Sequence, residues 1–148
     1  MKLAQIIIQI LVAMLIMGEV ALAHHSAAGY DIEKRVAISG EVLKASFRNP
    51  HGTIELMGDA PAREVNAKGD IIGAETTTGE ALEWEVETAA ANLLRRRAWD
   101  FKKVKKGDTL MLIGHPAKDG SSNLYLREIR FPDGTVFGDP DGQDKALD

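Results

Sequence analysis

The feature of this sequence that most constrains its fold is a succession of alternating apolar and polar residues with one helical stretch inside it. The longest alternation, residues 36–47, changes its apolar face close to Gly40, which is typical of a β-bulge or a sharp bend. Further strand patterns cover residues 53–57, 82–87, 109–113 and 124–131, and a short helical pattern covers residues 89–95. An Asp133-Gly134 hairpin signal leads to one more apolar stretch.

This order of elements predicts the fold class. A long bent strand, two strands, a short helix and two further strands follow one another in the OB-fold, a five-stranded, partly open barrel. We therefore expect a mainly β protein, a small OB-like five-stranded barrel with one short helix that Thr88 caps; a generic β-sandwich is the alternative. Two residues are expected in the core, Trp84 and Trp99. Three residues are expected on a solvated strand face, Glu83, Glu85 and Glu87.

The N-terminus has the pattern of a secretory signal peptide. Lys2 precedes an apolar run over residues 6–17, and Ala21-x-Ala23 has the small-residue spacing that signal peptidase cleaves. The run covers 12 residues, whereas a helix that spans a membrane needs about 20. We therefore expect cleavage after Ala23, no stable membrane insertion after processing, and a periplasmic or secreted mature protein.

Cleavage at this point gives a simple organisation. We predict a signal peptide over residues 1–23, an OB-like β domain over residues 24–137, and an acidic disordered tail over residues 138–148. Residues 58–80, rich in Gly, Ala, Thr and charged side chains, are expected to form a flexible insertion, either a long loop or a weak hairpin.

Composition excludes several classes of function. The chain has no cysteine, so disulfides, thiolate metal sites and thiol catalysis are excluded. The formal net charge is −4, and an acidic chain is not expected to bind nucleic acid, which requires a basic surface. No carboxylate pair, catalytic triad or dense metal motif is visible, so a conventional hydrolase is not expected. No protein partner is indicated.

The four histidines are the strongest candidates for chemistry. They lie at the mature N-terminus and at predicted turns or strand ends: His24, His25, His51 and His115. If His24 is first, its amine and its imidazole Nδ1 can close a chelate ring on a metal ion, and a second imidazole then gives a three-nitrogen site. Nitrogen-rich tetragonal coordination favours Cu(II). An OB barrel places His51 and His115 on one rim, so we predict copper binding through His24 with His51 or His115.

Other interpretations of the same residues stay open. Ni(II) or Zn(II) can take these ligands, and His24 with His25 can form a purely local site. The arm before residue 36 reaches His51 only if it is nearly extended. A different class of function is a binding module in the cell envelope, whose barrel face takes a small ligand or a protein partner. A copper enzyme of oxygenase type is a third possibility.

Four further residues are candidates for binding or for holding the site. Tyr30 and Asp31 are expected to anchor the N-terminal arm, Tyr30 by burial and Asp31 by a turn bond. Asn49 belongs to the Asn49-Pro50-His51 turn. Arg48 can join residues 95–97 and 102–103 in a basic patch for an anionic partner, although a solvated helix end is the simpler interpretation.

Several of these motifs resemble one family. They are His24-His25-Ser26, Tyr30-Asp31, Gly40-Glu41-Val42, Asn49-Pro50-His51, Leu94-Arg95-Arg96 with Trp99, Lys106-Gly107-Asp108, and the loop Gly114-His115-Pro116-Ala117-Lys118-Asp119-Gly120. Together they resemble a family of exported bacterial proteins classed as a domain of unknown function. Ala27 stands where that family usually has Phe, and Gly52-Thr53 replaces a small residue followed by Trp. The resemblance implies export and this fold, and it implies no activity.

Overall fold

The computed structural model describes residues 27–72 and 79–138. The expected signal peptide, His24, His25 and nearly all of the expected acidic tail lie outside the described residues. The elements, in chain order, are η1 (Ala27–Gly29), β1 (Val36–Ser46), β2 (Gly52–Gly58), β3 (Arg63–Glu64), β4 (Leu82–Thr88), α2 (Ala91–Arg96), η2 (Phe101–Lys103), β5 (Thr109–Pro116), β6 (Asn123–Arg130) and β7 (Val136–Gly138). No helix among them is long and apolar enough to cross a membrane.

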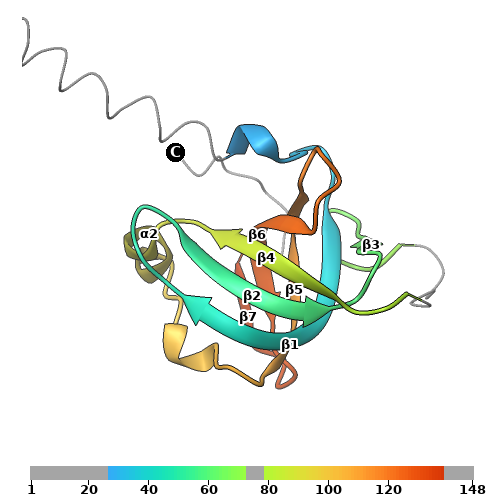
Figure 1. Ribbon diagram of the computed structural model, residues 1–148. Coiled ribbons are helices and arrows are strands. Elements are labelled where there is room, and N and C mark those ends of the chain that lie inside the picture. The colour runs from blue at the N-terminus through green and yellow to red at the C-terminus, as the bar shows by residue number, and fades with distance from the viewer. Residues whose placement is uncertain (1–26, 73–78, 139–148) are drawn as a thin grey trace, which may run out of the picture.

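The strands form the predicted five-stranded barrel, and the barrel is closed. The order in the sheet is β2-β4-β6-β5-β1, and pairing of β1 with β2 closes it (Figure 1). All neighbours are antiparallel except β4 and β6, which pair in parallel through residues 85–87 and 123–125. This is OB topology with two additions, β3 beside β1 and β7 beside β6. The OB-like prediction is confirmed, and the alternative of a sandwich is wrong.

The bend predicted in the first strand is what lets β1 take part in both halves of the barrel. Residues 36–41 of β1 pair with β5, and residues 40–46 pair with β2, with a register shift between Val42 and Lys44. At Gly40 a side chain has no room, because a Cβ atom there would lie 2.1 Å from the carbonyl oxygen of Met57. Glycine therefore allows the two strands to cross closely where the sheet folds over.

The barrel interior is filled by the apolar faces of β1, β2, β4, β5 and β6. Ile38, Ile54, Val86, Leu112 and Leu124 are fully buried in one cluster. Trp84 and Trp99 belong to the same cluster, as predicted. Alternation of buried and exposed residues along β2 and β4 shows that the other face of these strands points outward.

The helix begins later than predicted, and Thr88 does not cap it. Thr88 is the last residue of β4, paired with Gly52, and its hydroxyl donates to the carbonyl of Ala89. The N-cap position of α2 is Ala90, which makes no side-chain cap. The side chain of Asn49 instead accepts a hydrogen bond from the amide of Asn92 at 3.2 Å. The first turn of α2 is therefore fastened by the turn that precedes β2.

The insertion between β2 and β4 packs partly on the outside of the barrel. β3 pairs with the start of β1, and Val65 and Ile71 form an antiparallel bridge. Both side chains pack on Ala37 and Ile113, forming a second, smaller apolar cluster. The described part of the insertion, up to residue 72, thus has the weak-hairpin form that the sequence left open.

A buried carboxylate on β6 anchors this hairpin to the barrel through two arginines. Glu128 on β6 is fully buried. It accepts a hydrogen bond from Arg130 Nε, and its other oxygen lies 3.8 Å from Arg35 Nη2. The two arginines then donate to the carbonyls of Lys68 and Ala67, both at 2.8 Å. One carboxylate therefore positions two guanidinium groups, and both donate hydrogen bonds to carbonyls of the same turn.

Candidate functional site

Three polar residues form a row across the outer face of the barrel. Glu87 on β4 is paired with Tyr125 on β6, and Tyr125 is paired with His115 on β5. Residues directly opposite one another in neighbouring strands point to the same face. Their chain neighbours Val86 and Leu124 face the core, so the row faces outward.

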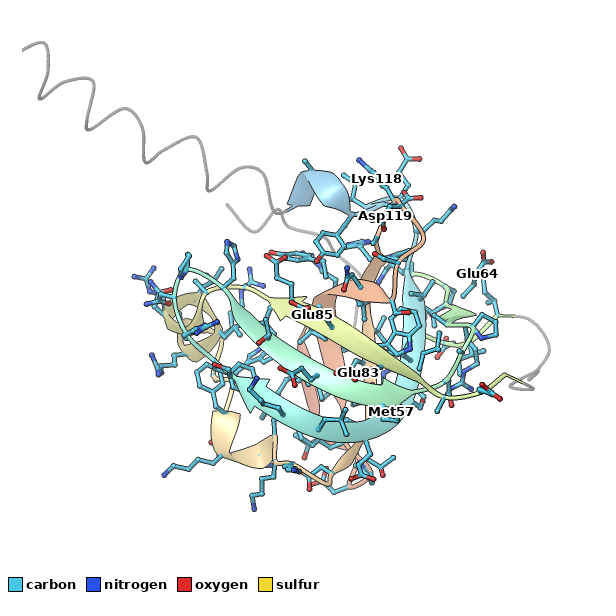
Figure 2. The ribbon with its side chains drawn as sticks, in the orientation of Figure 1. Met57, Glu64, Glu83, Glu85, Lys118 and Asp119 are labelled. Carbon is cyan, nitrogen blue, oxygen red and sulfur yellow. The ribbon has the colours of Figure 1, made fainter. Side chains whose placement is uncertain are left out.

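The N-terminal arm, residues 27–35, covers this row. Tyr30 forms an antiparallel bridge with Ala117, and the Asp31 amide donates to the Pro116 carbonyl at 2.8 Å. Lys118 holds the start of the arm twice, from its amide to the Gly29 carbonyl at 2.9 Å and from Nζ to the Ala28 carbonyl at 3.0 Å. Figure 2 shows Lys118 at this position beside η1. The arm is therefore built into the edge of the barrel and is not a loose tail.

At the end of the row, three side chains are linked in sequence. The Tyr30 hydroxyl donates to Glu87 Oε2 at 3.1 Å, and its ring lies 5.5 Å from that of Tyr125. His51 Nδ1 lies 3.2 Å from Glu87 Oε1. These last two atoms are shielded from solvent and have no hydrogen-bond partner among the described residues. They are close enough for an ion pair but are not aligned as a hydrogen bond.

The electrostatics of the site follow from its partial burial next to a carboxylate. Burial raises the pKa of the Tyr30 hydroxyl above its ordinary value, and the charge and hydrogen bond of Glu87 raise it further. Burial also raises the pKa of Tyr125, while Arg127 and Arg97 oppose that shift. Both tyrosines are therefore held as neutral phenols.

His115 is placed differently from His51. It is 3% exposed, beneath the arm, and its Nδ1 lies 2.7 Å from the Lys34 carbonyl. Because a carbonyl only accepts, Nδ1 carries the proton in this contact. His51 and His115 share one face, but β4 and β6 lie between their strands, a span of about 14 Å at the usual strand spacing. Glu87 and Tyr125 lie between the two histidines.

The remaining candidates have contacts that fasten the backbone. Asp31 accepts from the Glu33 amide at 3.3 Å and lies 3.4 Å from Lys34 Nζ, so its contacts lie within the turn of the arm. The Arg48 carbonyl accepts from the Ala91 amide at 3.2 Å, while its side chain is exposed. Together with the hydrogen bond that the Asn49 side chain accepts, this attaches the turn before His51 to α2.

Sequence reasoning missed two residues of the site, Glu87 and Tyr125. Glu83 and Glu85 are exposed as predicted (Figure 2), but Glu87 is half-buried beneath Tyr30, so the prediction of a solvated position is wrong for it. The three glutamates have the same spacing, and nothing in the local pattern distinguishes the third. Only the covering arm makes it different.

The chemistry open to this arrangement depends on its donor atoms. Within residues 27–72 and 79–138, no group of three or more histidine and carboxylate side chains forms a ready-made metal site. The described residues do bring together one imidazole nitrogen and one carboxylate oxygen, which are two donors suited to a divalent metal. A hollow of about 430 Å³ lies further along β4, lined by Glu55, Glu83, Trp84, Glu85, Ser121, Ser122 and Asn123.

Two solved structures are similar in fold at low sequence identity. A mitochondrial single-stranded DNA binding protein from S. cerevisiae, Rim1, is 9% identical, with 70% of this chain and 94% of that chain covered and a TM-score of 0.42. The protein PriB from Ralstonia solanacearum is 14% identical, with 66% and 97% covered and a TM-score of 0.33. Likeness at this level carries no argument about function, so the absence of nucleic-acid binding stays a prediction.

Sequence comparison identifies a family and no activity. No curated protein matches the chain. The model of a family of unknown function, DUF6152, matches residues 12–69 and 70–125, which is more than half of the chain. The resemblance to a domain of unknown function is thus confirmed, and the chain belongs to the DUF6152 family.

Proposed function

We propose that the exported, processed protein binds one Cu(II) ion through the amine and imidazole of His24 together with His51, with Glu87 as a neighbouring oxygen donor. The main support is the pair His51 Nδ1 and Glu87 Oε1, two buried atoms 3.2 Å apart without hydrogen-bond partners among the described residues. Buried polar atoms of this kind normally have a partner. A metal ion between them is a partner that satisfies both.

The separation of the two atoms fits a shared ion. Nitrogen and oxygen ligands lie about 2.0–2.2 Å from a zinc-sized divalent ion, so two ligands at near a right angle are about 3 Å apart. The observed 3.2 Å is close to that spacing. The described residues supply two donors, and a tetragonal Cu(II) site requires at least two more. An N-terminal histidine supplies two from one residue.

The position of the arm supports this source of ligands. Three peptide units separate His24 from Ala27, so their Cα atoms are at most about 11 Å apart. The single turn of η1 then leads to Tyr30, whose hydroxyl is bonded to Glu87. This short tether supports His24 as the source of further ligands for a site at His51. His115 is the weaker candidate, because its Nδ1 already contacts the Lys34 carbonyl beneath the arm.

The test is a copper titration of the processed protein, with mass spectrometry confirming that His24 is the first residue. Spin-resonance couplings report the number of nitrogen ligands. Loss of a group that merely supports a ligand costs about 10–100-fold in affinity, so His51→Ala is expected to cost at least that much. Glu87→Gln is expected to weaken binding less. His25→Ala is the matched control and is expected to leave the affinity unchanged.

Two results would overturn the proposal in different ways. Equal affinity of wild type and His51→Ala rejects the folded site and leaves a local His24–His25 site, in which case His25→Ala weakens binding. Equal affinity of the processed chain and one with an added N-terminal glycine rejects the amine as a ligand.

The second candidate function is a binding module at the barrel face. The hollow beside Glu83 and Glu85 supports it, because an open, polar, acidic cavity suits a cationic small ligand. Ligand binding there is expected to be insensitive to the added glycine and to His51→Ala, and sensitive to Glu83→Gln. The two candidates therefore separate in one set of variants.

A further inference from the structure

α2 and η2 lie at one end of the barrel (Figure 1), and the exposed basic side chains of this region form a basic surface. It is formed by six side chains: Arg48, Arg95, Arg96, Arg97, Lys102 and Lys103. None of the six forms an ion pair with any residue that the structure describes. Asp100, the single acidic residue between Arg95 and Lys106, is already used, because its carboxylate caps η2 by accepting from the Lys102 amide at 3.0 Å. Asp133 is close enough to Lys103 for that cation to lower its pKa, so one acidic residue lies near six cations and the surface keeps a net positive charge.

Stacked rings hold the surface in place. The rings of Phe47 and Phe101 are parallel within 5°, with centroids 4.3 Å apart. The Arg95 guanidinium lies over Phe101, 5.2 Å from its centroid. This stack joins the end of β1, and with it Arg48, to α2 and η2. Segments distant in sequence thus present their cations from one rigid base, which lowers the entropy lost when an anionic partner binds.

The end of the described chain lies next to this surface. Phe137 on β7 stacks on Trp99, with ring centroids 5.5 Å apart, and the Trp99 amide donates to the Leu94 carbonyl of α2 at 3.1 Å. Lys103 Nζ donates to Thr135 Oγ1 at 3.3 Å, just before β7. Gly138 has a φ of 132°, where a Cβ atom would meet the Arg127 carbonyl at 2.5 Å. The chain therefore leaves the sheet at a defined point beside α2.

The residues after Gly138 are complementary in charge to the basic surface. Residues 139–148 contain four aspartates and one lysine. Ten residues reach at most about 33 Å. Phe137 stacks on Trp99, which is two residues after Arg97 in the sequence, so the basic surface lies within this reach. A segment tethered so closely has an effective concentration of about millimolar, so a contact with an intrinsic Kd below about 1 mM is mostly occupied.

We infer that the acidic segment 139–148 docks on the basic surface formed by Arg48, Arg95, Arg96, Arg97, Lys102 and Lys103. The charges, the anchor at Gly138 and the short tether all favour the chain's own segment over a separate partner. The contact hides the basic surface and requires no metal ion, so this inference does not depend on the proposed copper function.

A spin label on the segment tests the docking in the full chain. The chain has no cysteine, so Gln143→Cys gives one labelling position and changes no charge. The amide signals of residues 95–103 are expected to lose most of their intensity. Those of Met57 and Glu83, at the ends of β2 and β4 that lie away from α2, are expected to keep it. Raising the salt from about 0.01 M to about 1 M shortens the Debye length from about 30 Å to about 3 Å, and the intensity is expected to return.

Charge variants separate docking from mere proximity. Replacing the four aspartates of the segment by asparagine, at constant chain length, is expected to restore the signals. Arg95→Gln with Arg96→Gln is expected to restore most of them, whereas the matched surface variant Lys34→Gln with Lys68→Gln is expected to have no effect. Equal loss of signal in the asparagine variant, or no effect of salt, overturns the inference.

A mixing experiment decides between the chain's own segment and a second copy. Isotope-labelled chain without a spin label is mixed with spin-labelled chain that carries no isotope. No loss of signal at residues 95–103 is expected in the mixture. A loss in the mixture equal to that in the doubly labelled chain means that a second copy supplies the segment, which overturns the inference.

Discussion

Replacing Tyr30 by phenylalanine removes one hydrogen bond and little else. The ring contact with Tyr125 at 5.5 Å is kept, and only the bond from the hydroxyl to Glu87 Oε2 is lost. Hydrogen bonds to charged groups contribute about 1.5–3 kcal/mol. Because Tyr30 is only half-buried, we expect the lower end, about 1.5 kcal/mol, which is about tenfold in an equilibrium constant. The arm of the variant is therefore expected to open about ten times more often.

Amide hydrogen exchange measures this opening directly. The Asp31 and Lys118 amides are bonded across the junction of arm and barrel, so their exchange is expected to accelerate about tenfold. The Val42 amide, bonded to the Asp108 carbonyl on another part of the barrel, serves as the control and is expected to be unchanged. Unchanged exchange at Asp31 and Lys118 would refute the claim that Tyr30 and Glu87 hold the arm. Equal acceleration at Val42 would instead indicate a global loss of stability.

Two further predictions concern stability. Glu128→Gln leaves the guanidinium groups of Arg35 and Arg130 without their buried carboxylate. Breaking such a buried pair costs about 3–5 kcal/mol of folding stability. Because Arg130 is partly exposed, we expect a loss of about 3 kcal/mol, which lowers Tm by about 10 °C. A loss below about 1 kcal/mol in urea unfolding contradicts this role of Glu128. Stability is also expected to fall as the pH rises above about 10, because the pKa values of Tyr30 and Tyr125 are raised in the folded state, which therefore binds more protons than the unfolded chain. The loss of stability begins at the tyrosine pKa of the unfolded chain and continues toward the higher pKa of the folded state. Tyr30→Phe is expected to make this loss smaller. An equal loss in wild type and variant would show that Tyr30 does not contribute to it.

The fold was predictable because the residue pattern that indicates each strand lies within that strand. Alternation located the strands of the barrel, and the face change near Gly40 located the bend of β1. The cap of α2 was not predictable in the same way, since Thr88 has the right residue type but is used as the last residue of β4. Asn49, 43 positions earlier in the sequence, satisfies the helix amide instead.

The candidate site was less predictable, because it depends on what covers each strand. Glu87 has the same spacing as Glu83 and Glu85 and differs from them only by the arm packed above it. Glu128 has an outward position on β6, yet it is fully buried because the insertion lies over it. Burial of an outward-facing residue is a tertiary property, so alternation within one strand cannot reveal it.

The short parallel pairing of β4 with β6 bears on the order of folding. Three residue pairs make this seam, and Glu87 with Tyr125 is one of them. The seam joins segments about 40 residues apart and is expected to close late, as non-local pairings do. The arm docks on Pro116, Ala117 and Lys118 and so follows β5. Whatever binds between arm and barrel therefore acts on the last folding step and, by mass action, stabilises only the completed barrel.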